Sequence, residues 1–268
     1  MLTFEAIGTA WKIKAADFDI SSKKQELLSI VDAFERDYSR FTKNSYIGRL
    51  NSGEALQNPP AELVEMLCFA EKAHRTTSGA FNIFIGATLE NNGYGLEDNN
   101  SYTVDFTSAL SFTAEQAKIN GQHSIDLGGF GKGWLIDKIS TWLKDCSDDF
   151  VVNGGGDIYV QGKATIAIES YGCDVAIRNQ AIASSRAMNR SWIFKGKHHS
   201  HIPDARQELE ISVIANTAKV ADMVATTGLI VDEHQLADLE DEYTAKILLV
   251  ASGQVVYCSE TEFFNVNV

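Results

Sequence analysis

The chain has 268 residues, 44% of them hydrophobic, so it can bury a substantial core and fits one large domain or two closely packed lobes. A small scaffold stapled by disulfides is excluded. The 36 acidic residues outnumber the 23 basic ones, which gives a net charge of −13, and no run of Lys or Arg could neutralise a row of phosphates. We therefore expect no nucleic-acid partner.

The N-terminal residues 1–15 alternate apolar and polar side chains in the manner of a β-strand. They lack the basic start, the apolar block and the small-residue cleavage site of a secretory leader. No stretch of the chain approaches the roughly eighteen uninterrupted apolar residues of a membrane helix. We therefore expect a cytoplasmic protein with neither a signal peptide nor a transmembrane segment.

Helical periodicity predicts two helices in the first third of the chain. Ser22 and Gln25 form a capping-box pattern before apolar residues spaced by three and four, which predicts the first helix. Its apolar face comprises Leu27, Leu28, Val31, Phe34, Tyr38 and Phe41. A proline pair at 59–60 predicts the start of the second helix, and Gly79 predicts its end. The polar residues 91–101 are typical of a surface loop.

The second half of the chain combines two further helices with short strands. A third helix is predicted from about Gly133, and a fourth over about 218–231. Short apolar runs predict strands at 150–152, 157–160, 165–168, 174–177, 181–184, 209–215, 245–250 and 255–258. Strands in hairpin-like succession with inserted helices favour an α+β fold with a mainly antiparallel sheet. We expect a single two-lobed domain over residues 1–268.

The four cysteines give no sign of a metal or disulfide framework. Cys68, Cys146, Cys173 and Cys258 lie far apart and form no CxxC pair, which a zinc ribbon would need. We interpret them as buried, reduced thiols.

A glycine-rich junction joins an apolar strand to the third helix. Residues 125–133 read Ile-Asp-Leu-Gly-Gly-Phe-Gly-Lys-Gly, with four glycines and Lys132 directly before the helix. Glycines let the backbone approach a phosphate, and a helix N-terminus offers free N–H groups to an anion. The spacing differs from both common nucleotide fingerprints. The residues alone leave open an anion site or a plain turn that requires positive φ.

Three further clusters of polar residues are candidates for a site. The glycines at 154–156, before Asp157, are typical of a hairpin turn or of a close approach to a ligand. Asp222 and Thr226 lie four residues apart, hence on one helix face, where the carboxylate could bind a hard cation such as magnesium or pair with a Lys or Arg. The histidines within 198–201 could bind a metal, supply a base, or simply lie on the surface.

Several motifs follow one another along the chain. They are Phe4–Thr9, Tyr38–Phe41 with Arg49–Asn51, Ser78–Asn82, Asp126–Gly133, the glycine cluster that ends at Asp157, and Ala221–Thr226. In this order they resemble the ApbE family, the FAD:protein FMN transferases, over almost the whole chain. Three positions depart from the family pattern: Asn82 replaces the usual Asp, Arg186 stands at a glycine position, and the histidine segment 199–203 is distorted.

The resemblance implies that the protein binds FAD and Mg²⁺. The implied nucleotide-binding residues are Ile7, Phe41, Ala80, Phe81, Asn82, Asp126, Gly129, Lys132 and Asp157. The implied magnesium ligands are the side chains of Asp222 and Thr226 and the backbone carbonyl of Gly131. The first glycine cluster would then be a diphosphate site, where magnesium and Lys132 supply positive charge to an acidic protein.

The resemblance also implies a reaction, in which a threonine hydroxyl of an acceptor protein attacks the flavin-side phosphorus of FAD and releases AMP. Asp222 and a histidine are the implied catalytic residues. An ungapped match makes that histidine His199, and a two-residue deletion makes it His201. Two alternatives remain open: a magnesium-dependent FAD pyrophosphatase, with water as the acceptor, and a non-catalytic FAD-binding protein.

Overall fold

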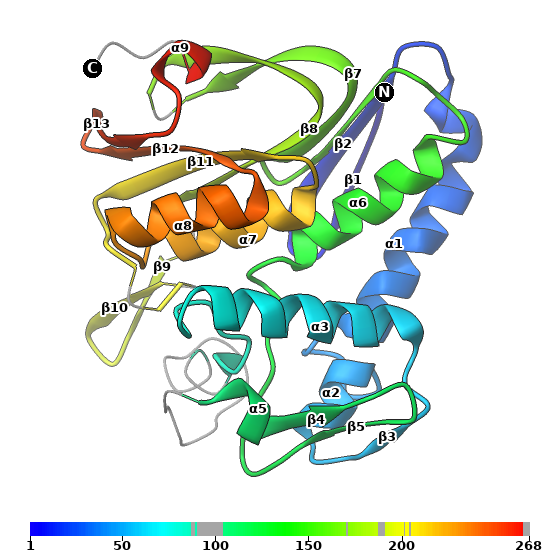
Figure 1. Ribbon diagram of the computed structural model, residues 1–268. Coiled ribbons are helices and arrows are strands. Elements are labelled where there is room, and N and C mark those ends of the chain that lie inside the picture. Colours follow the sequence, from blue (N-terminus) through cyan, green and yellow to red (C-terminus); the bar gives the residue numbers. More distant parts are fainter. Residues whose placement is uncertain are drawn as a thin grey trace. The chain divides into compact units, whose positions relative to one another are not determined.

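The structure is a computed structural model that describes residues 1–86, 89, 104–169, 171–186, 191–200, 202–203 and 205–264 (Figure 1). The loop predicted at 91–101 lies outside these residues. The chain forms two compact units. Unit 1 comprises residues 1–32, 130–189 and 205–268, and unit 2 comprises residues 33–129 and 190–204.

Unit 1 contains an eight-stranded sheet in the order β1-β2-β6-β7-β8-β11-β12-β13, and every neighbouring pair is antiparallel. The strands are β1 Leu2–Ala6, β2 Thr9–Ala15, β6 Phe150–Gly154, β7 Asp157–Ile168, β8 Cys173–Arg186, β11 Leu209–Ala215, β12 Lys246–Ala251 and β13 Gln254–Cys258. The prediction of an α+β fold with a mainly antiparallel sheet is therefore confirmed.

The alternating N-terminal segment forms a hairpin of two strands rather than one strand. Ile7 and Gly8, at φ 42° and 72°, make the turn between β1 and β2. Positive φ at both central residues is the turn geometry that matches the twist of a hairpin. Ile7 is β-branched, so the left-handed conformation is strained there.

The sequence predicts a break between strands within 157–168 and another within 174–184, but in the structure both fall at a bulge in the β7–β8 pair. Residues 157–168 and 173–186 form the continuous strands β7 and β8, not two short strands each. Gly162 and Asn179 both have positive φ where the register of the two strands shifts, and the Gly162 N–H donates to Asn179 Oδ1 over 2.8 Å. Turn-forming residues at these positions bend the pair without ending it.

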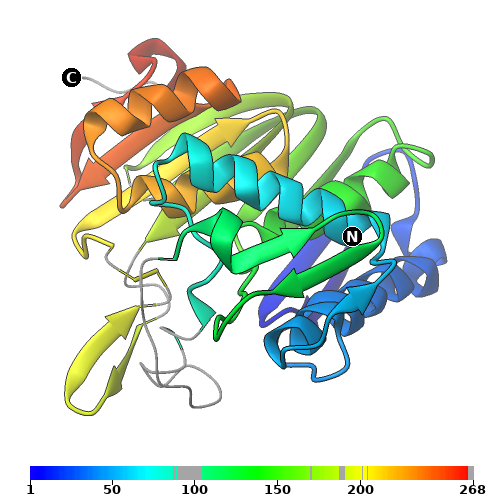
Figure 2. The same ribbon diagram turned by 60° about the horizontal axis from the view of Figure 1, so that its bottom comes forward.

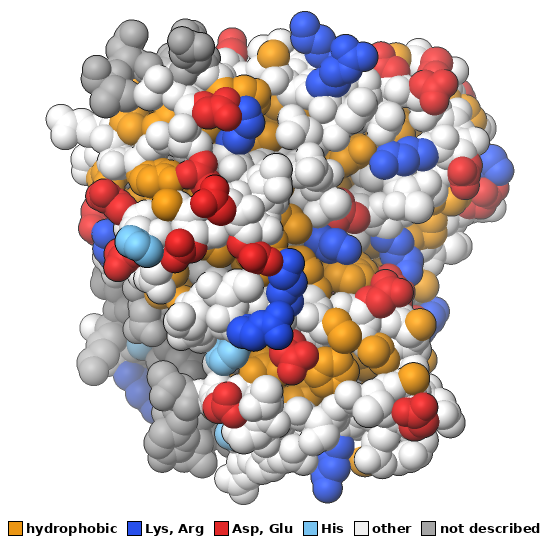
Figure 3. All heavy atoms as spheres, viewed as in Figure 1, with side chains coloured by type: hydrophobic (Ala, Val, Ile, Leu, Met, Phe, Trp, Pro, Cys, Tyr) orange, Lys and Arg blue, Asp and Glu red, His pale blue; other side chains and the backbone are white. Residues whose placement is uncertain are grey.

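The helices of unit 1 cover one face of this sheet. They include α6 Gly131–Leu143, α7 Ala218–Gly228 and α8 Glu233–Tyr243. α6 and α7 contact each other and the strands β6, β7, β8 and β11 (Figure 1). Acidic side chains gather over the exposed face of α8 (Figure 3).

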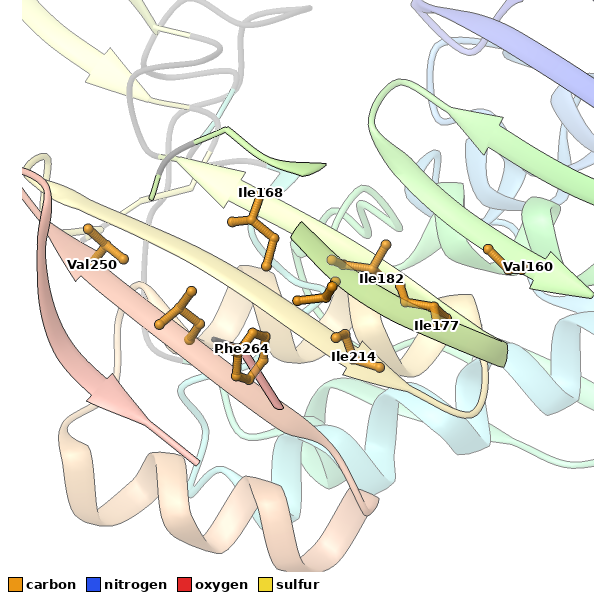
Figure 4. Close-up of a cluster of buried hydrophobic side chains, with 9 residues drawn as sticks. Val160, Ile168, Ile177, Ile182, Ile214, Val250 and Phe264 are labelled. Atoms are coloured by element: carbon orange, nitrogen blue, oxygen red, sulfur yellow. The ribbon is translucent and has the colours of Figure 1, made fainter. Parts of the chain in front are cut away.

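The opposite face of the sheet carries its own apolar cluster. Ile211 of β11 points toward α7, because its Cδ1 would meet a Cβ placed on Gly228, whereas Ile214 lies three residues on and points the other way. The cluster comprises Val160, Ile168, Val175, Ile177, Ile182, Ile214, Leu248, Val250 and Phe264 (Figure 4). Phe264 comes from α9, Thr261–Phe264, so this short helix closes the second face.

Unit 2 is built around helices and two small sheets. Its elements are α2 Tyr46–Asn51, α3 Ala61–Thr76, α5 Phe106–Ala109, a sheet in the order β3-β5-β4, and the pair β9 and β10. The strands are β3 Leu56–Gln57, β4 Leu110–Phe112, β5 Gln116–Ile119, β9 Ser191–Phe194 and β10 Lys197–Ser200. Among the described strands, β9 and β10 pair only with each other and form a separate ribbon (Figure 2).

The first predicted helix begins differently from its capping-box pattern. Asp19, not Ser22, is the N-cap, and it opens the 3-10 turn Ile20–Lys23 that leads into α1, Lys24–Tyr38. The helix ends before Phe41, because residues 39–45 form successive turns that lead to Ser45, the N-cap of α2. Phe41 is consequently 61% exposed and does not belong to the apolar face of α1.

The second predicted helix ends close to Gly79. α3 stops at Thr76, and Ser78 takes the left-handed conformation at φ 51°. The N–H groups of Ser78 and Gly79 donate to the carbonyls of Arg75 and His74, which is the Schellman pattern of helix ends.

The cysteines correct one expectation from the sequence. All four are free thiols, but Cys68 is exposed and the other three are half-buried. Cys68 lies on the exposed side of α3. Its neighbours in the sequence are apolar, so the sequence shows no sign of this exposure. Among the described residues, no helix has the length and apolar character needed to cross a bilayer.

Candidate active site

In unit 1, α6, α7 and β7 bring three charged side chains together. Lys132 lies in the first turn of α6, Asp157 begins β7, and Asp222 lies in α7. The Lys132 ammonium contacts Asp157 directly and lies 3.1 Å from Asp222 Oδ1. Asp222 Oδ2 accepts a 3.0 Å hydrogen bond from the backbone N–H of Gly133. We call Lys132, Asp157 and Asp222 the charged triad.

The charged triad has one negative charge in excess, because two carboxylates face one ammonium. The side chains of Asp157 and Asp222 are only 3% and 2% exposed. Burial opposes the charge of Lys132, but the two carboxylates outweigh burial and raise the Lys132 pKa. Burial raises the pKa of Asp157 against the opposing pull of Lys132, and the charge of Asp222 adds to the rise. A buried excess of negative charge favours the binding of a further cation.

The four glycines of the junction are not explained by a plain turn. Gly128, Gly129, Gly131 and Gly133 all lack positive φ, so the turn hypothesis based on that conformation is wrong. A Cβ on Gly133 would lie 2.2 Å from the carbonyl oxygen of Ala218, and one on Gly128 would lie 2.7 Å from Asp126 Oδ1. Gly133 therefore allows α6 and α7 to approach closely.

The second glycine cluster forms the predicted hairpin turn between β6 and β7. Gly155 and Gly156 have φ 70° and 102°, and the Gly156 N–H donates to Asn153 Oδ1 over 3.0 Å. A Cβ on Gly154 would lie 2.7 Å from the Trp11 ring, and one on Gly155 would lie 2.4 Å from Thr9 Oγ1. Turn geometry and packing against β2 explain these glycines, and the turn delivers Asp157 to the charged triad.

The donor groups on α7 suit a hard cation. Asp222 and Thr226 lie one helical turn apart, and Thr226 is half-buried. Thr227 donates its hydroxyl to the Met223 carbonyl, whereas among the described residues the Thr226 hydroxyl has no hydrogen-bond partner. In the described part of the chain, no three or more His, Cys, Asp or Glu side chains are grouped so that they could hold a metal ion. An all-oxygen set that includes a hydroxyl and a backbone carbonyl fits magnesium better than zinc.

In unit 2, the start of the glycine-rich junction rests on a buried ion pair. Arg40 Nε lies 2.5 Å from Asp126 Oδ2, and these side chains are 4% and 11% exposed. Asp126 Oδ1 accepts a 2.5 Å hydrogen bond from the Gly128 N–H. The Arg40 guanidinium also lies 4.4 Å from the centre of the exposed Phe41 ring. Both carboxylate oxygens of Asp126 therefore have partners that hold the turn in place. One face of the Phe41 ring lies against the Arg40 guanidinium.

Asn51 is a second support of this junction. Its Nδ2 donates to the Ile125 carbonyl over 3.0 Å, and its Oδ1 accepts from the Ile125 N–H over 2.7 Å. The amide thus pairs with the backbone 74 positions away as a neighbouring strand would. Arg40 and Asn51 lie within motifs of the sequence, but the sequence indicates no role for either, because their partners are distant along the chain.

The segment 80–82 is held mainly through its backbone and through Asn82. Phe81 is buried, its N–H donates to Thr77 Oγ1 over 2.9 Å, and His74 Nδ1 lies 3.0 Å from its carbonyl oxygen. Asn82 Oδ1 accepts from the Phe84 N–H over 2.9 Å, and Asn82 Nδ2 donates to the Val104 carbonyl over 3.1 Å. The oxygen and the nitrogen of the Asn82 amide therefore each make a hydrogen bond. A carboxylate at this position could not donate to the Val104 carbonyl.

Of the histidines, His199 lies on β10 opposite Trp192 of β9. Its ring stacks on Trp192 at a centroid distance of 6.2 Å and meets Phe194 edge-on at 6.5 Å. His201 lies outside the described residues. Arg186, which stands at a glycine position of the family pattern, pairs across the sheet with Glu210 of β11.

Comparison with known proteins gives the family of this chain. The model of the ApbE family matches residues 7–248. The chain is 21% identical to a FAD:protein FMN transferase of Haemophilus influenzae, over 93% of this chain and 85% of that protein. It is 24% identical to a FAD:protein FMN transferase of Chlamydia muridarum, over 77% of this chain and 76% of that protein.

Solved structures show the same fold. The crystal structure of the ApbE protein of Thermotoga maritima superposes with a TM-score of 0.85 at 20% identity and covers 99% of both chains. The fold is thus that of the flavin transferases. The chain belongs to the ApbE family.

Proposed function

We propose that this chain transfers FMN from FAD to a threonine or serine hydroxyl of an acceptor protein, with Mg²⁺ bound, and releases AMP. The observation that carries the proposal is the buried charged triad with one excess negative charge, one helical turn from Thr226, whose hydroxyl has no hydrogen-bond partner among the described residues. Membership of the ApbE family and relatives named FAD:protein FMN transferase support it.

The side chains of Asp222 and Thr226 and the backbone carbonyl of Gly131 would hold the magnesium ion. When bound there, the ion would neutralise negative charge on the phosphate oxygens. Gly131 stands two residues before Gly133, whose N–H already donates to Asp222. The three ligands therefore belong to helices that are in direct contact.

Lys132 and the N-terminus of α6 would bind the diphosphate. The N–H groups of Gly131 and Lys132 have no acceptor within the helix and would be available to phosphate oxygens, whereas that of Gly133 donates to Asp222. Lys132 would leave Asp222 for the phosphate and keep its contact with Asp157. We keep Ile7, Phe41, Ala80, Phe81, Asn82, Asp126, Gly129 and Asp157 as the other proposed FAD-binding residues.

In the proposed reaction, the acceptor hydroxyl oxygen forms a bond to the flavin-side phosphorus of FAD. The bond from that phosphorus to the bridging oxygen breaks, and AMP leaves with that oxygen. The hydroxyl proton passes to a base, for which we propose His199 or His201. Water in place of the hydroxyl would yield free FMN and AMP instead.

An Asp222→Ala variant tests the metal role. We expect loss of magnesium-dependent AMP release from FAD, with the fold retained because Lys132 keeps its contact with Asp157. The matched control is Asp232→Ala, which removes the N-cap of α8 in the same unit and should leave AMP release unchanged. AMP release at the wild-type rate in Asp222→Ala would reject the metal role. If Asp222 were only a structural ion-pair partner, the variant would lose about 3–5 kcal/mol of stability, but its folded fraction would still release AMP at the wild-type rate.

A further inference from the structure

α7 lacks a cap of its own. Its N-cap residue, Thr217, makes no side-chain hydrogen bond to the helix. The N–H groups of Ala218 and Lys219 donate instead to Asp137 of α6, to Oδ1 over 2.7 Å and to Oδ2 over 3.0 Å. A carboxylate that accepts two N–H groups at a helix N-terminus stabilises it through hydrogen bonds and through the helix dipole.

α6 is capped from α7 in the same way. Its N-cap residue, Phe130, has no side chain that can cap, and the Gly133 N–H donates to Asp222 Oδ2. Gly133 and Asp137 are one turn apart on α6, and Ala218 and Asp222 are one turn apart on α7. The two helices therefore cap each other through a pair of carboxylates.

We propose that Asp137 is a positioning residue for the magnesium site, because it fixes the rotation and depth of α7 against α6 and so the placement of Asp222. This inference rests on the proposed function. Asp137 lies one helical turn beyond Gly133 on α6, and among the described residues no hydrogen bond or ion pair joins it to Asp222 or Thr226. Its action passes through the two N–H groups at the start of α7, four residues before Asp222.

The side chains around Asp137 are compatible with this role. Asp137 is half-buried, and Lys219, whose N–H donates to it, places its ammonium over the Trp134 ring at 4.3 Å. Residues that hold a metal ligand in place typically change metal affinity by about 10–100-fold when mutated. We expect an effect of this size from loss of the Asp137 carboxylate.

The test compares Asp137→Ala, Asp137→Asn and the control Asp232→Ala with the wild type. Asp137→Asn keeps one acceptor oxygen, whereas Asp232→Ala removes a helix cap that does not touch α6. Calorimetric titration with Mg²⁺ alone should show affinity about tenfold or more weaker in Asp137→Ala, a smaller loss in Asp137→Asn, and no change in Asp232→Ala. Wild-type affinity in Asp137→Ala would overturn the proposal.

A second measurement is independent of the metal. Gly133 is the third residue of α6, so its N–H has no acceptor within the helix and owes its protection to Asp222. Hydrogen exchange followed by NMR should show faster exchange of this amide in Asp137→Ala and wild-type exchange in Asp232→Ala. Unchanged exchange in Asp137→Ala would overturn the positioning role. If exchange accelerates but the wild type binds no Mg²⁺, the positioning of Asp222 stands and the proposed metal fails.

Discussion

At the scale of single residues, Asn82 shows what a departure from the family pattern does in this chain. The amide accepts from Phe84 and donates to Val104, so it joins two segments that are 22 positions apart. An Asp would keep the first bond and place a carboxylate against the Val104 carbonyl. The Asn82 side chain therefore has a structural role in this chain, because it joins the two segments.

We predict that Asn82→Asp lowers the free energy of unfolding by about 1–3 kcal/mol, because a half-buried donor is lost and two acceptors face each other. Urea denaturation measures this change. Asn82→Ser serves as the control, since it removes the donor without adding a charge and should cost less. Equal stability of Asn82→Asp and the wild type would show that the Val104 bond contributes nothing.

The sequence predicted most of the charged residues of the candidate site but few of their contacts. Lys132, Asp157 and Asp222 were identified from three separate motifs, and the structure brings them together. Arg40, Asn51 and Asp137 were missed, because their partners lie 74 to 86 positions away and a hydrogen bond leaves no periodic pattern in the sequence.

Asp137 also gives a prediction on pH. Burial raises its pKa from 3.8 to about 6, and the N–H groups of Lys219 and Ala218 oppose that rise. The folded protein binds the Asp137 proton more tightly than the unfolded chain does. Protonated Asp137 therefore adds to the free energy of unfolding fully below pH 3.8, and this stabilisation is lost as the pH rises through about 6. The difference of 6 minus 3.8 corresponds to at most about 3 kcal/mol.

The wild type should therefore lose stability relative to Asp137→Asn as the pH increases from 4 to 7. Thermal denaturation of both proteins across this range measures the difference in their stability. Groups that titrate equally in both proteins cancel in this difference. A constant difference in stability would show that Asp137 does not titrate in this window.

At the scale of elements, the contact between α6 and α7 determines the geometry of the site. The sequence predicted both helices, because their apolar residues recur at helical spacing. It did not predict that they cap each other, and it attributed the glycines before α6 to an anion or to positive φ. Packing against Ala218 is the reason for Gly133.

We predict that Gly133→Ala separates the two helices and costs about 1–3 kcal/mol of stability, the usual cost of an overpacked contact. The variant should also lose the bond from the residue 133 N–H to Asp222. Ser140→Ala on the same helix is the control, because the buried Ser140 hydroxyl has no hydrogen-bond partner among the described residues and its removal should cost little. Wild-type stability in Gly133→Ala would contradict the tight packing.

Strand boundaries were the least accurate part of the prediction at this scale. Gly162 and Asn179 are residues that commonly form turns, and the sequence therefore split β7 and β8 into short strands. In the structure the two residues lie opposite each other and form a bulge. Local residue type cannot separate a bulge from a turn, because the difference lies in the partner strand.

At the scale of the whole molecule, the order of the motifs predicted the family, whereas the composition predicted only the size of the core and the net charge. The α+β class followed from hairpin-like strands with helices inserted between them. The expectation of two lobes gave no boundaries for them, since unit 2 gathers residues 33–129 with residues 190–204, which no local signal connects. The ribbon of β9 and β10, with His199, belongs to that second segment.

The central claim is that this chain moves FMN from FAD onto another protein. The most direct measurement incubates the protein with FAD, Mg²⁺ and a threonine-containing acceptor protein, then looks for flavin fluorescence on the acceptor after denaturing electrophoresis and for AMP in solution. The account predicts a covalently fluorescent acceptor, one AMP for each flavin transferred, and neither product with Asp222→Ala. AMP with free FMN and an unlabelled acceptor would identify a pyrophosphatase instead, and tight FAD binding without AMP would contradict any catalytic role.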